Sequence, residues 1–125
     1  MICLDTNYLI RCLVPGTKEA QAVTSWLQAK VLLIAPSLVW YEFCCGPVGE
    51  RETDLVRRVL TGGIIPFLEP HANEAARLFN KTGRKRHLRI DAAIAASAIV
   101  AGAEFASSNT NDFKEFVPFG LVLLD

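Results

Sequence analysis

Residues 91–106 read DAAIAASAIVAGAEFA, a helix-forming stretch followed directly by a short strand-forming one. From Asp91 to Ala101 the side chains are almost all small and apolar, which predicts a helix that packs closely against its neighbours. Gly102 is expected to end this helix, because glycine readily adopts the left-handed conformation found after helix ends. The short apolar run Glu104–Ala106 then follows as a strand. A helix leading directly into a short strand is typical of domains that contain a parallel sheet.

Similar apolar runs and helical patterns alternate along the rest of the chain. We expect further strands at Ile2–Leu4, Val31–Ile34 and Ile64–Ile65, and Leu121–Leu124 is the candidate for a fifth. Helices are expected over residues 8–13, 17–30, 37–45 and 50–60, and from residue 70 onward. The sequence therefore predicts a single α/β domain over residues 1–125, with three layers (α/β/α) around a mainly parallel sheet of four or five strands.

Composition and charge exclude several classes of protein. The 125 residues are 51% hydrophobic and 21% charged, which excludes a disordered chain. Thirteen Lys and Arg balance thirteen Asp and Glu, which excludes a generally cationic nucleic-acid binder but allows a local basic patch. The longest uncharged stretches, Val31–Tyr41 and Ala92–Ala103, are shorter than the roughly 20 residues that span a bilayer. Met1–Asp5 lacks the basic start of a signal peptide, so we expect a cytoplasmic protein without a membrane segment.

The four cysteines do not have the spacing of a metal site or a disulfide framework. The chain contains no C-x-x-C pair, and neither histidine lies at finger-type spacing from a cysteine pair. We therefore expect free, buried thiols at these positions: Cys3, Cys12, Cys44 and Cys45.

Three acidic residues stand alone in apolar stretches. Asp5 is the one charged side chain in residues 1–10, Glu42 in residues 31–49, and Asp91 in residues 90–103. Glu42 lies in a segment that is apolar on every face of a helix, which predicts a buried helix. A buried carboxylate requires a partner, a proton or a metal ion, and no Lys or Arg lies within four residues of Glu42.

The order of the strands predicts that these acids meet. Asp5 follows the first strand, Glu42 follows the second, and Asn109 and Asp112 follow the fourth. Parallel strands end at one edge of the sheet, and Asp91 joins them if its helix begins there. Two carboxylates about 4 Å apart repel by roughly 4 kcal/mol, so such a cluster requires a cation. Ligands with oxygen atoms alone favour Mg²⁺ or Mn²⁺, which activates water and neutralises charge at phosphorus.

Simpler roles remain open for the same residues. Asp5 could cap the following helix, and Asp91 could be an acid favoured by the helix dipole.

Residues 77–89 hold six of the thirteen basic residues and no acid. This basic segment is either a solvated surface or, beside a metal–carboxylate centre, a surface that binds a polyanion.

Four segments, in order and with suitable spacing, resemble the PIN-domain family: Met1–Asn7, Pro36–Glu42, Arg89–Ala96 and Ser107–Phe113. The resemblance covers essentially the whole chain and is closest to the VapC-type ribonuclease toxins of toxin–antitoxin pairs. It implies an acidic quartet that binds one or two Mg²⁺ or Mn²⁺ ions, and Asp5, Glu42 and Asp91 match its first three members. The fourth member is Asn109 or Asp112. Thr6, Asn7 and Ser107 match supporting polar positions.

The resemblance also implies an activity and partners. It implies an RNA endonuclease in which metal-activated water hydrolyses the phosphodiester bond, with catalytic Asp5, Glu42, Asp91 and Asp112. Such a protein is expected to form a homodimer and to be inhibited by an antitoxin. The RNA backbone would contact the basic segment at Arg84, Lys85, Arg86 and Arg89.

Two other functions are compatible with these residues. One is a small metal-dependent phosphatase-like hydrolase, although a covalent aspartyl phosphatase favours Asp-x-Asp where this chain has Asp5-Thr6-Asn7. The other is a non-catalytic PIN-like module that binds RNA or a partner protein.

Overall fold

A four-stranded parallel sheet forms the centre of the molecule, in the order β3-β2-β1-β4. The computed structural model describes residues 1–124. The strands are β1 (Ile2–Leu4), β2 (Leu33–Pro36), β3 (Gly63–Ile65) and β4 (Glu104–Ala106). Cys3 pairs with Ile34 of β2 on one side and with Phe105 of β4 on the other. All residues of β1 and β2 are buried, as expected for central strands covered on both faces.

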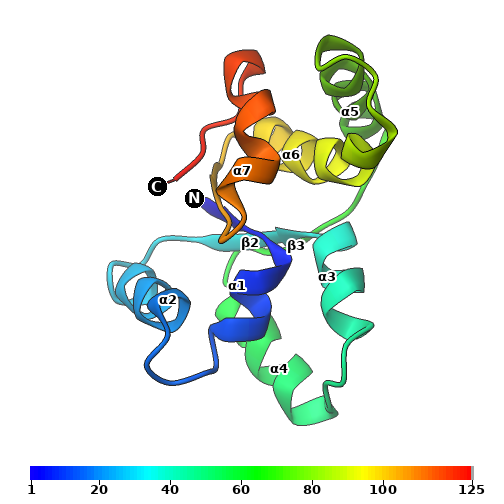
Figure 1. The fold of residues 1–125 in the computed structure, drawn as a ribbon. Helices are drawn as coiled ribbons and strands as arrows, with labels where there is room; N and C mark the ends of the chain where they lie inside the picture. Colours follow the sequence, from blue (N-terminus) through cyan, green and yellow to red (C-terminus); the bar gives the residue numbers. More distant parts are fainter. Residues whose placement is uncertain (125) are drawn as a thin grey trace.

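Helices cover both faces of the sheet (Figure 1). One layer consists of α1 (Thr6–Arg11), α2 (Lys18–Gln28), α3 (Ser37–Cys44) and α4 (Glu50–Val59). The other consists of α5 (Glu69–Lys81), α6 (Arg89–Ala101) and α7 (Thr110–Phe113). Two short 3₁₀ helices, η1 (Arg86–Leu88) and η2 (Lys114–Phe119), flank α6 and α7 in the chain. This arrangement confirms the predicted three-layer α/β/α fold with a parallel sheet.

The small-residue helix forms as the sequence predicts. All side chains from Ala92 to Ala98 are buried in α6, which packs against α5 and also contacts β2 and β4. Small side chains permit this close approach of helix and sheet. Gly102 ends the helix with a φ of 68°, in the left-handed region, and the chain enters β4 two residues later.

The candidate fifth strand at Leu121–Leu124 does not form. This segment forms one parallel bridge, between Phe105 and Leu123, instead of a strand. Phe105 donates a backbone hydrogen bond to Val122 at 2.7 Å and accepts one from Leu124 at 2.8 Å. The segment leaves η2 through Gly120 and reaches β4 at this single position, so the sheet has four strands.

The cysteines are free thiols, but only some are buried. Cys3 is buried in β1, whereas Cys44 and Cys45 are exposed at the end of α3, which corrects the expectation for these two. The reason is that α3 buries one face, with Val39 and Phe43, and leaves the opposite face uncovered. Among the described residues no helix has the length and apolar character needed to cross a membrane.

Candidate active site

Asp5 lies at the carboxyl end of β1 and is the buried acid of the site, 6% exposed. Its backbone N–H donates to the carbonyl of Ala106 at 3.0 Å, which ties the ends of β1 and β4 together. One carboxylate oxygen, Oδ1, accepts from the backbone N–H of Thr6 at 2.8 Å, and Oδ2 accepts from the Ser107 hydroxyl at 2.7 Å. Asp5 therefore caps α1 with one oxygen and contacts the loop after β4 with the other.

The loop after β4 is held by a chain of hydrogen bonds. The Ser107 hydroxyl, which donates to Asp5, also accepts from the backbone N–H of Asn109 at 3.0 Å. The backbone N–H of Ser108 donates to Oδ1 of Asn7 at 3.2 Å. Ser107 and Asn7, predicted as supporting polar residues, thus connect this loop to β1 and α1.

Glu42 reaches the same edge from α3, but it is exposed, so its predicted burial is wrong. The physical reason is the uncovered face of α3, on which Tyr41 is also 67% exposed. Oε1 of Glu42 accepts a hydrogen bond from the Thr6 hydroxyl at 2.9 Å. Thr6 therefore connects Glu42 to Asp5, because its backbone N–H donates to Asp5 and its hydroxyl donates to Glu42.

Asp91 lies in the first turn of α6, where its side chain is half-buried. Burial raises the pKa of Asp91 to about 6, and the charges of Asp112, Asp5 and Glu42 raise it as well, whereas His87 lowers it. Burial also raises the pKa of Asp5; hydrogen bonds from Ser107 and Thr6 oppose this rise, and the charges of Glu42 and Asp112 add to it. The four carboxylates are therefore close enough to act on one another.

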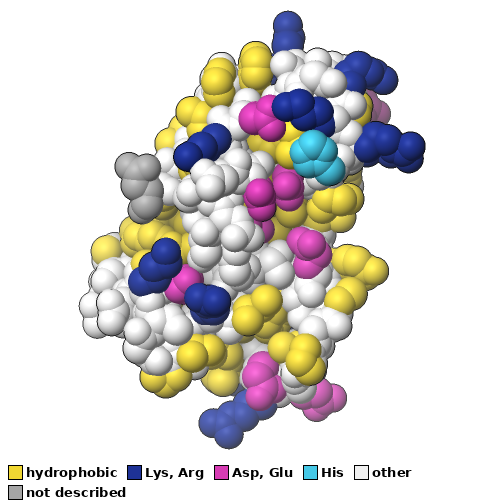
Figure 2. All heavy atoms as spheres, viewed as in Figure 1, with side chains coloured by type: hydrophobic (Ala, Val, Ile, Leu, Met, Phe, Trp, Pro, Cys, Tyr) yellow, Lys and Arg dark blue, Asp and Glu magenta, His cyan; other side chains and the backbone are white. Residues whose placement is uncertain are grey.

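Figure 2 shows acidic side chains gathered in the middle of this face, between the two helical layers, with a histidine beside them. Lys and Arg side chains lie on both sides of the acidic cluster. Both candidates for the fourth position are exposed near it: Asn109 is the N-cap of α7, and Asp112 lies in its first turn. The structure thus brings Asp5, Glu42, Asp91 and Asp112 to one edge of the sheet.

The donor chemistry of this cluster fits a hard divalent cation. Its side chains offer carboxylate oxygens, and the pKa values of Asp5 and Asp91 are raised first by burial and then by the charges of neighbouring carboxylates. Within residues 1–124, no three His, Cys, Asp or Glu side chains already stand in a geometry that would hold a metal ion. An ion held by Asp5 and Asp91 would complete its coordination with water or with the exposed side chains of Glu42 and Asp112.

The basic segment adjoins the acidic cluster through η1, since His87 acts on the pKa of Asp91. The four predicted RNA-binding residues, Arg84, Lys85, Arg86 and Arg89, are all exposed. Two of them already have partners in the protein. Lys85 forms an ion pair with Glu115 at 2.6 Å, and Arg84 hydrogen-bonds to Asn80.

Glu19, which no sequence pattern marked as a site residue, is a buried acid that contacts the loop after β4. Glu19 is 1% exposed, and its Oε1 accepts from the Ser108 hydroxyl at 3.1 Å and lies 3.6 Å from Nη1 of Arg11. An acid in the first turn of a helix is ordinarily explained by the helix dipole, so no local signal marks it as buried.

Comparison with known proteins agrees with this architecture. Residues 2–117 match the family model of the PIN domain. A toxin–antitoxin complex from Klebsiella pneumoniae has a similar fold, with a TM-score of 0.76 and 23% identity over 100% of this chain and 97% of that chain. FitAcB from Neisseria gonorrhoeae aligns with a TM-score of 0.74 and 23% identity, again over 100% of this chain and 97% of that one.

VapBC2 from Rickettsia felis, solved with a DNA fragment from its promoter, aligns with a TM-score of 0.69 and 20% identity. That alignment covers 99% of this chain and 98% of the other. Comparison with curated proteins gives no match. These identities establish a shared fold, and the family match covers most of the sequence. The chain belongs to the PIN-domain family.

Proposed function

We propose that this protein is a metal-dependent RNA endonuclease. The observation that carries the proposal is the buried carboxylate of Asp5, held by Thr6 and Ser107 while the charges of Glu42 and Asp112 act on it. PIN domains are typically nucleases and generally use divalent metal ions. An acidic cluster of this kind repels a phosphodiester unless a cation is bound, so the proposed activity requires Mg²⁺ or Mn²⁺.

In the proposed mechanism each side chain has a distinct role. Asp5 and Asp91 would hold the ion from the sheet and from α6, and Glu42 and Asp112 would complete the site from α3 and α7. The bound ion would supply positive charge that activates water and stabilises the leaving oxygen. Thr6 orients Glu42, and Ser107 orients Asp5 and favours its ionised form. Asn109 is the alternative to Asp112 as the fourth member.

We further propose that the protein is the toxin of a type II toxin–antitoxin pair, acting in the cytoplasm as a homodimer. Its likeness to the Klebsiella pneumoniae toxin–antitoxin complex and to VapBC2, over nearly the full length of each chain, supports an antitoxin as partner. Induced expression should arrest growth, and co-expression of a short protein encoded beside it should restore growth. Growth arrest that persists in an Asp91→Asn variant would argue against a nuclease toxin.

The activity is tested with purified protein and a labelled single-stranded RNA. Cleavage is expected with Mg²⁺ or Mn²⁺, and EDTA is expected to abolish it. Asp91→Asn should remove cleavage, whereas Asp54→Asn, a matched change of an exposed acid in α4, should leave it unchanged. Cleavage that persists in Asp91→Asn would show that the acidic cluster is not the active site.

The two alternative functions give different outcomes in the same preparation. Hydrolysis of a phosphomonoester without RNA cleavage would identify a phosphatase-like hydrolase. RNA binding that persists in chelator, together with calorimetry that detects no metal binding, would identify a non-catalytic module.

A further inference from the structure

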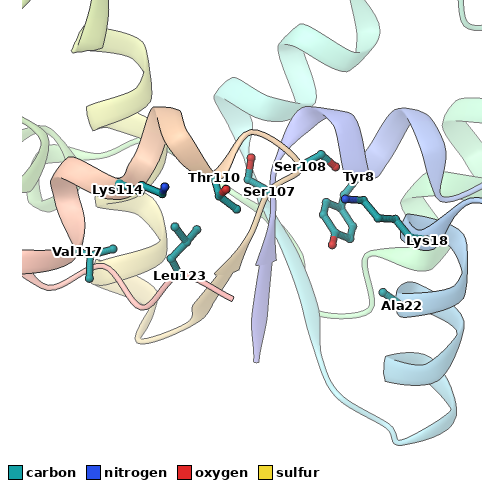
Figure 3. A pocket seen from close by; sticks show the side chains of 9 residues that line it. All are labelled: Tyr8, Lys18, Ala22, Ser107, Ser108, Thr110, Lys114, Val117 and Leu123. Carbon is teal, nitrogen blue, oxygen red and sulfur yellow. The ribbon is translucent and has the colours of Figure 1, made fainter. Parts of the chain in front are cut away.

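A cavity of about 760 Å³ lies next to the acidic cluster, at the loop after β4. Figure 3 shows Lys114 approaching it from one side and Lys18 from the other, with the side chains of Ser107, Ser108 and Thr110 between them. Ser107 lines this cavity and also donates to Asp5 at 2.7 Å. The cavity and the acidic cluster therefore share a wall.

The two lysines bring positive charge that has no partner within the protein. Lys18 is the first residue of α2 and Lys114 is the first residue of η2, and both are exposed. Neither forms an ion pair within residues 1–124, in contrast to Lys85, which pairs with Glu115 at 2.6 Å. Lys18 also lies in the first turn of α2, where a cation is unfavourable because the helix dipole is positive there. An anionic group bound at each lysine would supply the missing negative charge.

The remaining walls fit the rest of a nucleotide. The Thr110 hydroxyl makes no hydrogen bond with residues 1–124 and is free to donate or accept, whereas the Ser107 and Ser108 hydroxyls already donate to Asp5 and Glu19. Tyr8 and the apolar side chains of Ala22, Val117 and Leu123 complete the lining. The volume lies within the range of about 300–1,000 Å³ typical of ligand pockets.

The local charge balance also favours an anion. Glu19 lies against Ser108, but its carboxylate is 3.6 Å from the Arg11 guanidinium, which offsets its negative charge. The cavity walls themselves contain two lysines and no acidic residue. A phosphodiester group would therefore meet attraction here and repulsion at the metal-free acidic cluster.

We propose that this cavity is a nucleotide subsite that binds the RNA next to the scissile phosphate, with Lys18 and Lys114 each contacting a flanking phosphate. This inference rests on the proposed RNA endonuclease function and extends it to substrate binding. It places RNA contacts on α2 and η2, in addition to the basic segment before α6. The bound RNA would then follow a path from the lysine cavity, past Ser107, to Asp5.

The first test measures binding in the full chain carrying Asp91→Asn, with EDTA present so that RNA stays intact. A labelled single-stranded RNA is titrated at several salt concentrations against this protein and against the same protein with Lys18→Gln and Lys114→Gln. We expect the double change to weaken binding about tenfold and to reduce the log–log salt slope by about 1.4, since each phosphate contact on a single strand contributes roughly 0.7.

The matched control is Lys30→Gln. Lys30 is exposed and follows α2 at the amino end of β2, away from the carboxyl edge of the sheet. The Lys30→Gln change removes one positive charge just after α2, and it should leave the RNA affinity and the salt slope almost unchanged. Thermal melting of each variant checks that the fold is intact.

The second test measures cleavage with the acidic cluster intact. Lys18→Gln with Lys114→Gln should raise KM about tenfold and leave kcat nearly unchanged, because the lysines contact RNA away from the reacting phosphate. If wild-type protein cleaves RNA and the double variant keeps its affinity, salt slope and KM, the subsite is wrong and the endonuclease proposal stands. If wild-type protein neither binds nor cleaves RNA, both proposals are wrong.

Discussion

The Ser107 hydroxyl donates a 2.7 Å hydrogen bond to Oδ2 of Asp5, joining residues 102 positions apart in the chain. Burial raises the pKa of Asp5, and this hydrogen bond is the largest influence opposing the rise. A hydrogen bond to the ionised form of a buried carboxylate stabilises that form. Ser107 therefore helps to keep Asp5 charged, which is the form able to bind a cation.

Ser107→Ala is expected to reduce cleavage about tenfold, because outer-shell partners of metal ligands typically contribute 10–100-fold. Removing the hydrogen bond raises the pKa of Asp5 further, so the acidic limb of the pH–rate profile should move to higher pH. Ser107→Thr keeps the hydroxyl and should restore most activity, and Ser25→Ala on α2 serves as an exposed control. A Ser107→Ala profile that overlays the wild-type profile would contradict this role.

Thr6→Val should lower activity severalfold without lowering stability appreciably. Valine has nearly the same shape but cannot donate the 2.9 Å hydrogen bond that Thr6 makes to Glu42. Since Glu42 is exposed, the lost bond should change the free energy of unfolding by less than about 1 kcal/mol. Cleavage assays and urea denaturation separate these effects, with Thr6→Ser as the conservative variant and Thr24→Val on α2 as control. Full activity in Thr6→Val would mean that Glu42 does not need this partner.

Metal-free protein should become more stable as the pH falls from about 7.5 to about 5.5. The pKa of Asp91 is about 6 in the folded protein, above its ordinary value of 3.8. Between pH 3.8 and pH 6, therefore, the folded state binds a proton at Asp91 that the unfolded state has largely released. Stability from this group is therefore lost as the pH rises through the folded pKa. Thermal melting in EDTA measures the effect.

The Asp91→Asn variant removes this titration. We expect it to melt at a higher temperature than wild-type metal-free protein near neutral pH and to show a weaker dependence on pH. Asp54→Asn is the control. Mg²⁺ or Mn²⁺ should raise the melting temperature of wild-type protein, because a ligand that binds the folded state stabilises it, and should do so much less in Asp91→Asn. Equal pH dependence in wild type and Asp91→Asn would show that another group is responsible.

Glu19→Ala is expected to destabilise the protein by about 2 kcal/mol, since it leaves a cavity and removes the acceptor of the half-buried Ser108 hydroxyl. Glu19→Gln keeps an acceptor for Ser108 and should cost less. The exposed acid Glu104 provides the control, and Glu104→Ala should change the free energy of unfolding by less than about 0.5 kcal/mol. Urea denaturation gives all three values, and equal stability of Glu19→Ala and wild type would refute the structural role.

Local sequence signals predicted most of the secondary structure because they act within a few residues. Thr17 caps α2, where its hydroxyl accepts from the backbone N–H of Ala20 at 3.1 Å, and Gly102 closes α6. Two strands, Ile2–Leu4 and Glu104–Ala106, have the predicted bounds. The expected strand at Val31–Ile34 instead begins at Leu33, because Leu32 is exposed before the chain enters the sheet.

The sequence by itself determined the parallel α/β architecture and the presence of isolated acids after the strands, since apolar periodicity and chain order are local properties. The tertiary structure alone decided which of these acids is buried: Asp5, beneath the loop that carries Ser107, and not Glu42 on α3. It also decided that Lys18 and Lys114 line one cavity although 96 positions separate them by number. Periodicity predicts which face of a helix is apolar, but what covers that face and which distant side chains meet depend on how the layers pack.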